Sequence, residues 1–491
     1  MATRAYPQHE ISAFPEKTII KNVRSDEFSN DTDQESEIIK YWDDKEEARV
    51  RRKIDFILLP VLGLAFFGLQ VDRGNISAAL TSTITEDLHI NTNQINVGTQ
   101  LLSAGIVVSE IPSNIILQRV GPQVWLSAQL VAWGVVGVFQ AFVKSYPAFL
   151  VTRLLLGLLE GGFIPGALYY LSQWYKRPET SFRTTLFFYG QMFAGATSSL
   201  ISAGLLKLSG RGGLAGWQWI FLIEGLITIF AAILFILFIP KRAGDGSPLA
   251  SMGRWSYFTE REKQIIRDRV LLDDPLKARD NIKITGRDIW DTIRKPTVIQ
   301  HFMITLVSMS AFQGLNQYAP SMIKSFGFSA VRANALASVA VYASIVWLTI
   351  LAWLSDKTGV RGPFVLLCIT WNVISYACLR TVPDDASRWH KYAVITIANT
   401  VYASMHVLNI AWLGFNCKTP QERSIAMALI VMAANCAGIS GSQIFRTSDK
   451  PLYYHALTAI TALAGASWVQ TLVLILWYAV TQKRTGRKGA V

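Results

Sequence analysis

The feature that most constrains this chain is a series of apolar runs, each of about 20 residues. An α-helix needs about that length to cross a bilayer, because each residue advances it by about 1.5 Å. Twelve such runs begin near residues 54, 95, 124, 146, 181, 217, 298, 331, 364, 392, 424 and 455. Only 16% of the residues are charged, against roughly 25% in soluble domains. The sequence therefore predicts an all-α membrane protein with twelve transmembrane helices.

One long polar stretch, residues 241–297, divides the runs into two sets of six. We predict a first half at 54–240 and a second half at 298–480. Residues 1–53 are polar and acid-rich and are predicted to form a disordered tail, and 481–491 form a short basic tail. Within the polar stretch, Thr259 and Glu262 form a capping-box pattern that predicts a helix as far as about Leu272.

The two halves also repeat each other in sequence, which is typical of transporters. Three landmarks of the first half recur in the second half at offsets of 240 to 242 residues. They are Gly121-Pro122 with Gly362-Pro363, Pro178 with Pro420, and Arg183 with Arg423.

The formal net charge of +13 comes mainly from basic residues between the apolar runs, and no basic domain typical of nucleic-acid binding is present. Basic residues at both chain ends and in the central stretch predict that both termini are cytoplasmic. The four cysteines have no metal-ligand spacing, so we expect neither a zinc site nor a disulfide framework. Because phosphate-binding and nucleophile motifs are absent, we predict no cofactor and no enzymatic activity.

Two charges interrupt the fourth apolar run, in the stretch RLLLGLLEGGFIPG at residues 153–166. Arg153 and Glu160 are seven residues apart and share one helix face, and each costs about 2.5 to 3.5 kcal/mol at a helix centre. The pair therefore predicts a polar cavity or charged partners, or alternatively two charges that only neutralise each other. Gly157, Gly161 and Gly162 add a strip where another helix can approach closely.

The loop LSDKTGVRGP, with the twelve runs divided six and six, resembles the major facilitator superfamily. This resemblance implies two six-helix bundles and a gating motif at Asp356, Lys357, Gly359 and Arg361. The corresponding stretch of the first half, SNIILQRVGPQ, lacks the acidic residue of that motif.

More specific stretches resemble the anion:cation symporter family. They are VDRGNISAAL at 71–80, RLLLGLLEGGFIP and WQWIFLIEG at 217–225. The stretch TEREKQIIRDRV at 259–270, together with the overall length, resembles the family's fungal branch of allantoate, nicotinate and pantothenate permeases. The resemblance implies that Arg73 binds the anionic group of the substrate and that Asp72 and Glu160 accept the coupled proton. Arg153 is then a partner of the acids or a second contact for the anion.

Other polar residues lie inside the predicted helices. In the second half, uncharged groups are candidates to line the cavity, with plain interhelical hydrogen bonding as the alternative. These candidates are Gln313, Asn316, Gln317, His406, Asn409 and Asn435. In the first half, the sequence assigns no role to Glu110, and it favours a structural role near the membrane interface for Glu224.

The function implied by this resemblance is secondary active transport, in which a small organic anion moves together with protons by alternating access. We expect a monomer in the plasma membrane that imports a carboxylate vitamin, ureide or related metabolite. Its partners are then the anion, protons and the lipid bilayer, without nucleic acid. Export of a secondary metabolite and a non-transporting nutrient sensor are the alternatives.

Overall fold

The structure is a computed structural model that describes residues 17–20, 36–273, 286–401, 404–417, 419–450 and 452–485. Its first part contains β1 (Lys17–Ile20), β2 (Ser36–Ile39), α1 (Asp44–Ala79), α2 (Ile84–Asp87), α3 (Thr92–Val120), α4 (Pro122–Gln140), α5 (Tyr146–Glu160), α6 (Phe163–Trp174), α7 (Arg177–Leu205) and α8 (Gly216–Phe238). The rest contains α9 (Glu260–Asp273), α10 (Gly286–Ile293), α11 (Pro296–Ser325), α12 (Ala330–Thr358), α13 (Gly362–Arg380), α14 (Arg388–Asn399), α15 (Ser404–Asn416), α16 (Pro420–Ser442) and α17 (Tyr454–Thr485). Short 3-10 helices lie at Leu206–Leu208, Arg211–Gly213, Leu249–Ser251 and Thr447–Asp449, and the two strands pair antiparallel.

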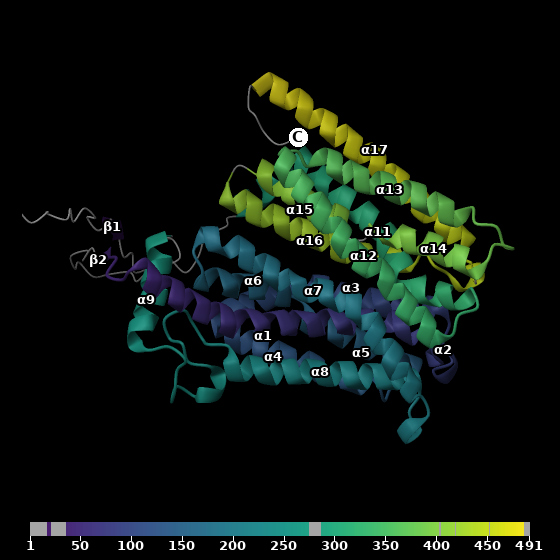
Figure 1. Ribbon diagram of the computed structural model, residues 1–491, viewed down its shortest axis with the longest axis horizontal. Helices are drawn as coiled ribbons and strands as arrows, with labels where there is room; N and C mark the ends of the chain where they lie inside the picture. Colours follow the sequence, from purple (N-terminus) through teal and green to yellow (C-terminus); the bar gives the residue numbers. More distant parts are fainter. Residues whose placement is uncertain are drawn as a thin grey trace, which may run out of the picture.

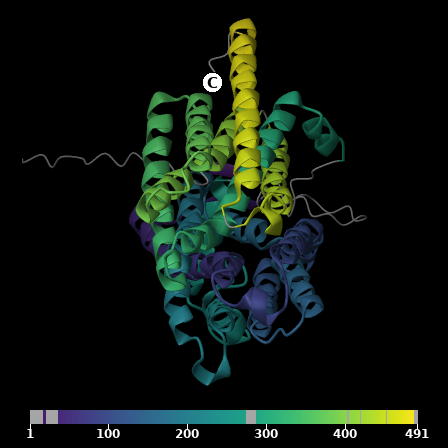
Figure 2. The same ribbon diagram turned by 90° about the vertical axis from the view of Figure 1, so that its right-hand side faces the viewer.

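The long helices form two bundles that lie side by side (Figures 1 and 2). Helices α1 and α3 to α8 make the N-terminal bundle, in the lower part of Figure 1, and α11 to α17 make the C-terminal bundle above it. Helix α9 packs on α1 and α6 at the left of Figure 1, and α2 lies at the right. We call these two ends of the molecule the loop end and the far end.

The predicted all-α membrane fold is confirmed. Within the described residues, eleven helical segments are long and apolar enough to cross a membrane, and α7 is a further 29-residue helix of the bundle. Two of these segments, Tyr146–Trp174 and Arg388–Asn416, are each made of two consecutive helices. Apart from α1, the helix formed by each apolar run begins at the predicted residue or up to four residues before it. For example, α7 begins at Arg177, where the predicted start was residue 181.

The first helix begins earlier than predicted, at Asp44, so residues 44–53 are helical rather than part of a disordered tail. The Asp43 side chain accepts a hydrogen bond from the backbone N–H of Glu46, which caps the helix. Three acidic residues in the first turn favour the helix N-terminus as well. The strands β1 and β2 also lie inside the predicted tail, whose other residues before 40 are outside the described part.

The sequence repeat has a structural counterpart. Pro122 and Pro363 each lie in the first turn of a 19-residue helix, α4 and α13. An ion pair also recurs at the loop end of both bundles, with its charges exchanged. Arg183 donates two hydrogen bonds to Asp55 at 2.9 and 2.8 Å, and Lys295 pairs with Glu422 at 2.7 Å.

The glycines of the fourth run let α5 approach α3 closely, as predicted. A Cβ atom on Gly157 would lie 2.1 Å from the carbonyl oxygen of Leu102, and one on Gly161 would lie 1.9 Å from Ser109 Oγ. At Gly157 the obstacle is backbone, which no change of rotamer can remove.

We therefore expect Gly157→Ala to separate α3 from α5 and to lower the melting temperature of the detergent-purified protein. Gly204→Ala is the matched control, because a Cβ atom there meets nothing within 4 Å and alanine favours a helix. A Gly157→Ala protein with the melting temperature of the control variant would contradict this packing.

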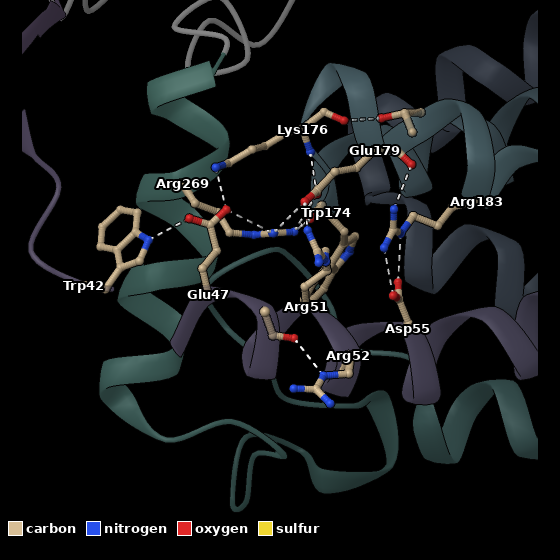
Figure 3. Close-up of polar contacts among 12 residues, drawn as sticks. Trp42, Glu47, Arg51, Arg52, Asp55, Trp174, Lys176, Glu179, Arg183 and Arg269 are labelled. Carbon is tan, nitrogen blue, oxygen red and sulfur yellow. Dashed lines mark hydrogen bonds and ion pairs between the residues drawn. The ribbon is translucent and has the colours of Figure 1, made fainter. Parts of the chain in front are cut away.

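A cluster of buried charges at the loop end fixes α9 to the N-terminal bundle (Figure 3). Arg269 of α9 is 0% exposed, and its Nη2 atom donates to the carbonyl oxygen of Trp174 at 2.9 Å and lies 3.2 Å from Glu179 Oε2. Glu47 of α1 pairs with Lys176 at 2.5 Å and lies 3.7 Å from Arg269 Nη1. Two carboxylates from two helices therefore share the buried guanidinium.

The predicted capping box opens α9. The backbone N–H of Thr259 donates to Glu262 Oε2 at 2.8 Å, and the N–H of Glu262 donates to Thr259 Oγ1 at 3.3 Å. Lys53 of α1 also donates to Glu262, at 2.8 Å. Burial acts to raise the pKa of Glu262, but the hydrogen bonds from Lys53 and Thr259 outweigh it and leave that pKa below its usual value.

The two bundles meet at the far end. Within the described residues, every hydrogen bond that joins the bundles lies there: those from Ser77 to Gln317, Asn96 to Phe445, Gln100 to Ile439, Tyr318 to Asn96, Lys324 to Thr81, Asn334 to Thr81 and Thr447 to Asn93. The side chain of Asn96 is central, because it bonds to the C-terminal bundle through both its nitrogen and its oxygen. The structure is therefore in a state closed at the far end.

Candidate functional site

The charges of the first and fourth apolar runs meet inside the N-terminal bundle. Arg73 of α1 donates from Nε to Oε2 of Glu160 on α5, at 2.7 Å. The side chain of Glu160 is fully buried, whereas 21% of the Arg73 side chain is exposed. Arg73 is therefore the accessible member of the pair, and a buried carboxylate holds it in position.

Arg153 does not pair with Glu160, contrary to the interpretation that the two neutralise each other. Its Nη2 atom donates to Asn75 Oδ1 at 3.3 Å, and its guanidinium lies over the rings of Phe149 and Phe221 at 5.4 and 5.5 Å. No ion pair of Arg153 is found within the described part of the chain. Seven residues along a helix advance about 10 Å, so α1 supplies the nearer cation for Glu160.

Asp72 points away from this pair, toward α8. It is 1% exposed and accepts a hydrogen bond from Thr228 Oγ1 at 2.9 Å. One turn along α8, Glu224 is 0% exposed and accepts from Ser202 Oγ at 3.1 Å. Glu224 therefore lies inside the bundle, bonded to α7 and one turn from the partner of Asp72.

The helix that carries Glu160 ends at this residue. Gly162 has a left-handed backbone with φ of 82°, which breaks the fourth run into α5 and α6. Gln129 of α4 donates to the carbonyl oxygens of Leu159 and Gly161, both at 2.9 Å. Sequence reasoning missed Gln129, although an amide inside the apolar third run was a signal. The negative end of the α5 dipole favours a cation or a proton beside Glu160.

The candidates of the second half divide into two groups. Gln313, Asn316, Gln317, His406 and Asn435 are partly buried. Gln317 accepts a hydrogen bond from Ser77 through its backbone oxygen. Its Nε2 atom and the Nδ1 atom of His406 are buried and have no partner in the part of the chain that the structure describes. A buried polar atom without a partner is costly, so these groups suit a site that a ligand completes.

Asn409 is a correction to the predicted cavity lining. It is 0% exposed, and its Oδ1 atom lies 2.6 Å from His301 Nδ1. Its Nδ2 atom donates to the backbone oxygen of His301 and to Thr305 Oγ1. Both polar atoms of the side chain are thus used to join α15 to α11, which is the alternative of interhelical hydrogen bonding.

The predicted gating motif lies where α12 ends. Gly359 has φ of 69° and closes the helix, which explains a glycine there. Lys357 Nζ lies over the ring of Trp353 at 5.0 Å, and the Arg361 guanidinium lies 4.2 Å from the ring of Phe415. The side chain of Asp356 is outside the described residues.

Two repeated helical bundles, with buried charges inside the first of them, indicate a multi-pass membrane protein of the secondary-transporter class. Residues 62–442 match the Major Facilitator Superfamily. The chain belongs to this family.

Several relatives share most of the chain. An uncharacterized transporter of Saccharomyces cerevisiae is 30% identical over 84% of this chain and 76% of its own length. A putative tartrate transporter of Agrobacterium vitis is 30% identical over 80% of this chain and 81% of its own length. A solved D-xylose-proton symporter superposes with a TM-score of 0.64 at 15% identity, over 85% of this chain and 97% of the other, which shows the shared fold.

Proposed function

We propose that this protein carries a small organic anion together with one or more protons, driven by the proton gradient. The observation that carries this proposal is the pair of Arg73 and Glu160. Its arginine is partly exposed, and its carboxylate is fully buried at the end of a helix. A substrate carboxylate is attracted to the same guanidinium, which can form bidentate hydrogen bonds with it.

Anion and proton are coupled through this shared arginine. When a substrate carboxylate binds to Arg73, Glu160 loses its counter-ion. Because an unpaired buried carboxylate is costly, Glu160 then takes up a proton. By thermodynamic linkage, a proton on Glu160 frees Arg73 and strengthens anion binding. Asp72, buried beside Thr228, is a second proton acceptor, and Arg153 adds positive potential from within the same bundle.

One relative supports an anionic substrate. The putative tartrate transporter of Agrobacterium vitis is named for a small dicarboxylate, and carboxylate vitamins and ureides offer the same group to Arg73. The basic residues of the chain ends and central stretch support a cytoplasmic loop end, in a plasma-membrane protein with both termini cytoplasmic. The state closed at the far end is then the inward-facing state of an alternating-access cycle.

The test begins with a thermal-shift screen of nicotinate, pantothenate, allantoate and tartrate, because a bound ligand raises the melting temperature. Protein in liposomes should then acidify the lumen when an acid that binds is added outside. Glu160→Gln should abolish this acidification and the concentrative uptake driven by a pH gradient, while Glu86→Gln, on the exposed helix α2, should leave both unchanged. Concentrative uptake by Glu160→Gln at the wild-type rate would refute the coupling.

A further inference from the structure

One face of α3 lines the boundary between the two bundles. Asn96 Nδ2 donates to the carbonyl oxygen of Phe445 at 2.8 Å, and Gln100 Nε2 donates to that of Ile439 at 3.2 Å. One turn further on, a Cβ atom on Gly438 would lie 2.8 Å from Ser103 Oγ. Since residues 96, 100 and 103 share a face, residue 110, seven positions after 103, shares it too.

These contacts also place Glu110 along the boundary. Residues 96, 100 and 103 of α3 contact residues 445, 439 and 438, so the numbers of the contacted residues fall as those on α3 rise. The segment 438–445 therefore runs antiparallel to α3. This direction places Glu110 toward the part of α16 that precedes Gly438. In agreement, Glu110 is close enough to the Cys436 thiol to interact electrostatically. Within the described residues, no hydrogen bond joins the bundles at this level.

The carboxylate of Glu110 is incompletely satisfied. Its Oε2 atom is buried and has no hydrogen-bond partner among the described residues, while the residue as a whole is only partly buried. Arg73 is near enough to act on it electrostatically, but the ion pair of Arg73 in this state is with Glu160. Within the described residues, Glu110 is thus an acceptor whose Oε2 atom has no donor, at the bundle boundary and within electrostatic range of the arginine to which we assign the substrate anion.

We propose that Glu110 binds a hydrogen-bond donor of the substrate, an N–H or O–H group, while Arg73 binds its carboxylate. This inference rests on the proposed function and narrows its substrate class to hydroxy, amino or ureido acids. When an analogue without the donor binds, the Glu110 oxygen stays buried and unpaired. The site therefore discriminates strongly against that analogue, because an unpaired buried polar atom costs more than a lost contact. We expect a preference of about 10- to 100-fold for the donor-bearing acid, the range of one charge-assisted hydrogen bond.

The experiment uses pairs of acids that differ only in hydroxyl donors: tartrate with succinate, and lactate with propionate. Dissociation constants are measured by thermal shift and by competition for uptake into liposomes. The wild type should prefer the donor-bearing member of each pair that binds. Glu110→Ala should remove this preference by weakening only the donor-bearing acid. Glu86→Ala, an exposed carboxylate outside the boundary, should keep it.

Binding of the donor-free acid by Glu110→Ala also reports that the variant is folded. Equal binding of both acids by the wild type, or an unchanged preference in Glu110→Ala, would overturn this inference and leave the proposed anion site standing. So would equal losses for both acids, which would indicate a structural role. If the wild type binds acids of neither kind, the anion site at Arg73 is itself wrong, and the inference fails with it.

Discussion

Arg73→Ala is expected to reduce uptake of any transported carboxylate by about 100-fold or more. The substitution removes the cation that we assign to the substrate, and it also leaves the fully buried Glu160 without its 2.7 Å partner. Removing one member of a buried ion pair costs about 3 to 5 kcal/mol. Arg73→Lys keeps the charge but loses the planar fork that matches a carboxylate, so a partial loss, about 10-fold, is expected.

The measurement is initial uptake into liposomes under a fixed pH gradient, with Arg211→Ala on the exposed far-end loop as the matched control. The double variant Arg73→Ala with Glu160→Gln separates folding from function, because it removes both charges together. It should regain the melting temperature of the wild type but not its uptake. Uptake by Arg73→Ala at a third of the wild-type rate or more is incompatible with the proposed anion site.

Arg269→Met should have the largest effect on stability. Arg269 is 0% exposed and lies between Glu47 of α1 and Glu179 of α7, so its loss leaves two buried carboxylates with less counter-charge. The expected cost is about 3 to 5 kcal/mol. It should appear as a lower melting temperature and as faster proteolysis of the central connection, because α9 is released from the N-terminal bundle.

The same helix offers a matched control. Arg267 is two residues away, its side chain is 62% exposed, and it pairs with Asp268 at 2.9 Å. An exposed pair contributes about 0 to 1 kcal/mol, so Arg267→Met should change neither the melting temperature nor the proteolysis rate appreciably. Equal behaviour of the two variants would show that the buried cluster does not hold α9.

Much of the fold could be predicted from the sequence because the governing features are local. Hydrophobic runs of membrane-spanning length placed the helices, and prolines at the first turns of α4 and α13 marked their starts. The early start of α1 was missed because residues 44–53 are polar. A polar segment that packs on α9 through ion pairs carries no hydrophobic signal of its own.

The candidate site was predicted less completely. Spacing along one helix placed Arg153 and Glu160 on a common face, and both are indeed buried. The cation that reaches Glu160, however, comes from another helix. In the same way, His406 and Asn409 lie one turn apart on α15. Both polar side-chain atoms of Asn409 are hydrogen-bonded to α11, whereas Nδ1 of His406 has no partner among the described residues. Periodicity identifies a helix face but not the neighbour that covers it.

The sequence by itself predicted which stretches form the membrane-length helices and which apolar runs contain buried charge. Those properties depend on the hydrophobicity and order of residues along one chain segment. Only the tertiary structure decided that Glu160 pairs with Arg73 and that Arg153 lies between two aromatic rings. It also decided that, among the described residues, Glu110 Oε2 is buried at the bundle boundary without a hydrogen-bond partner. The physical reason is that a buried charge is stabilised by whichever group helix packing brings within reach, and close approach at residues such as Gly157 sets that packing.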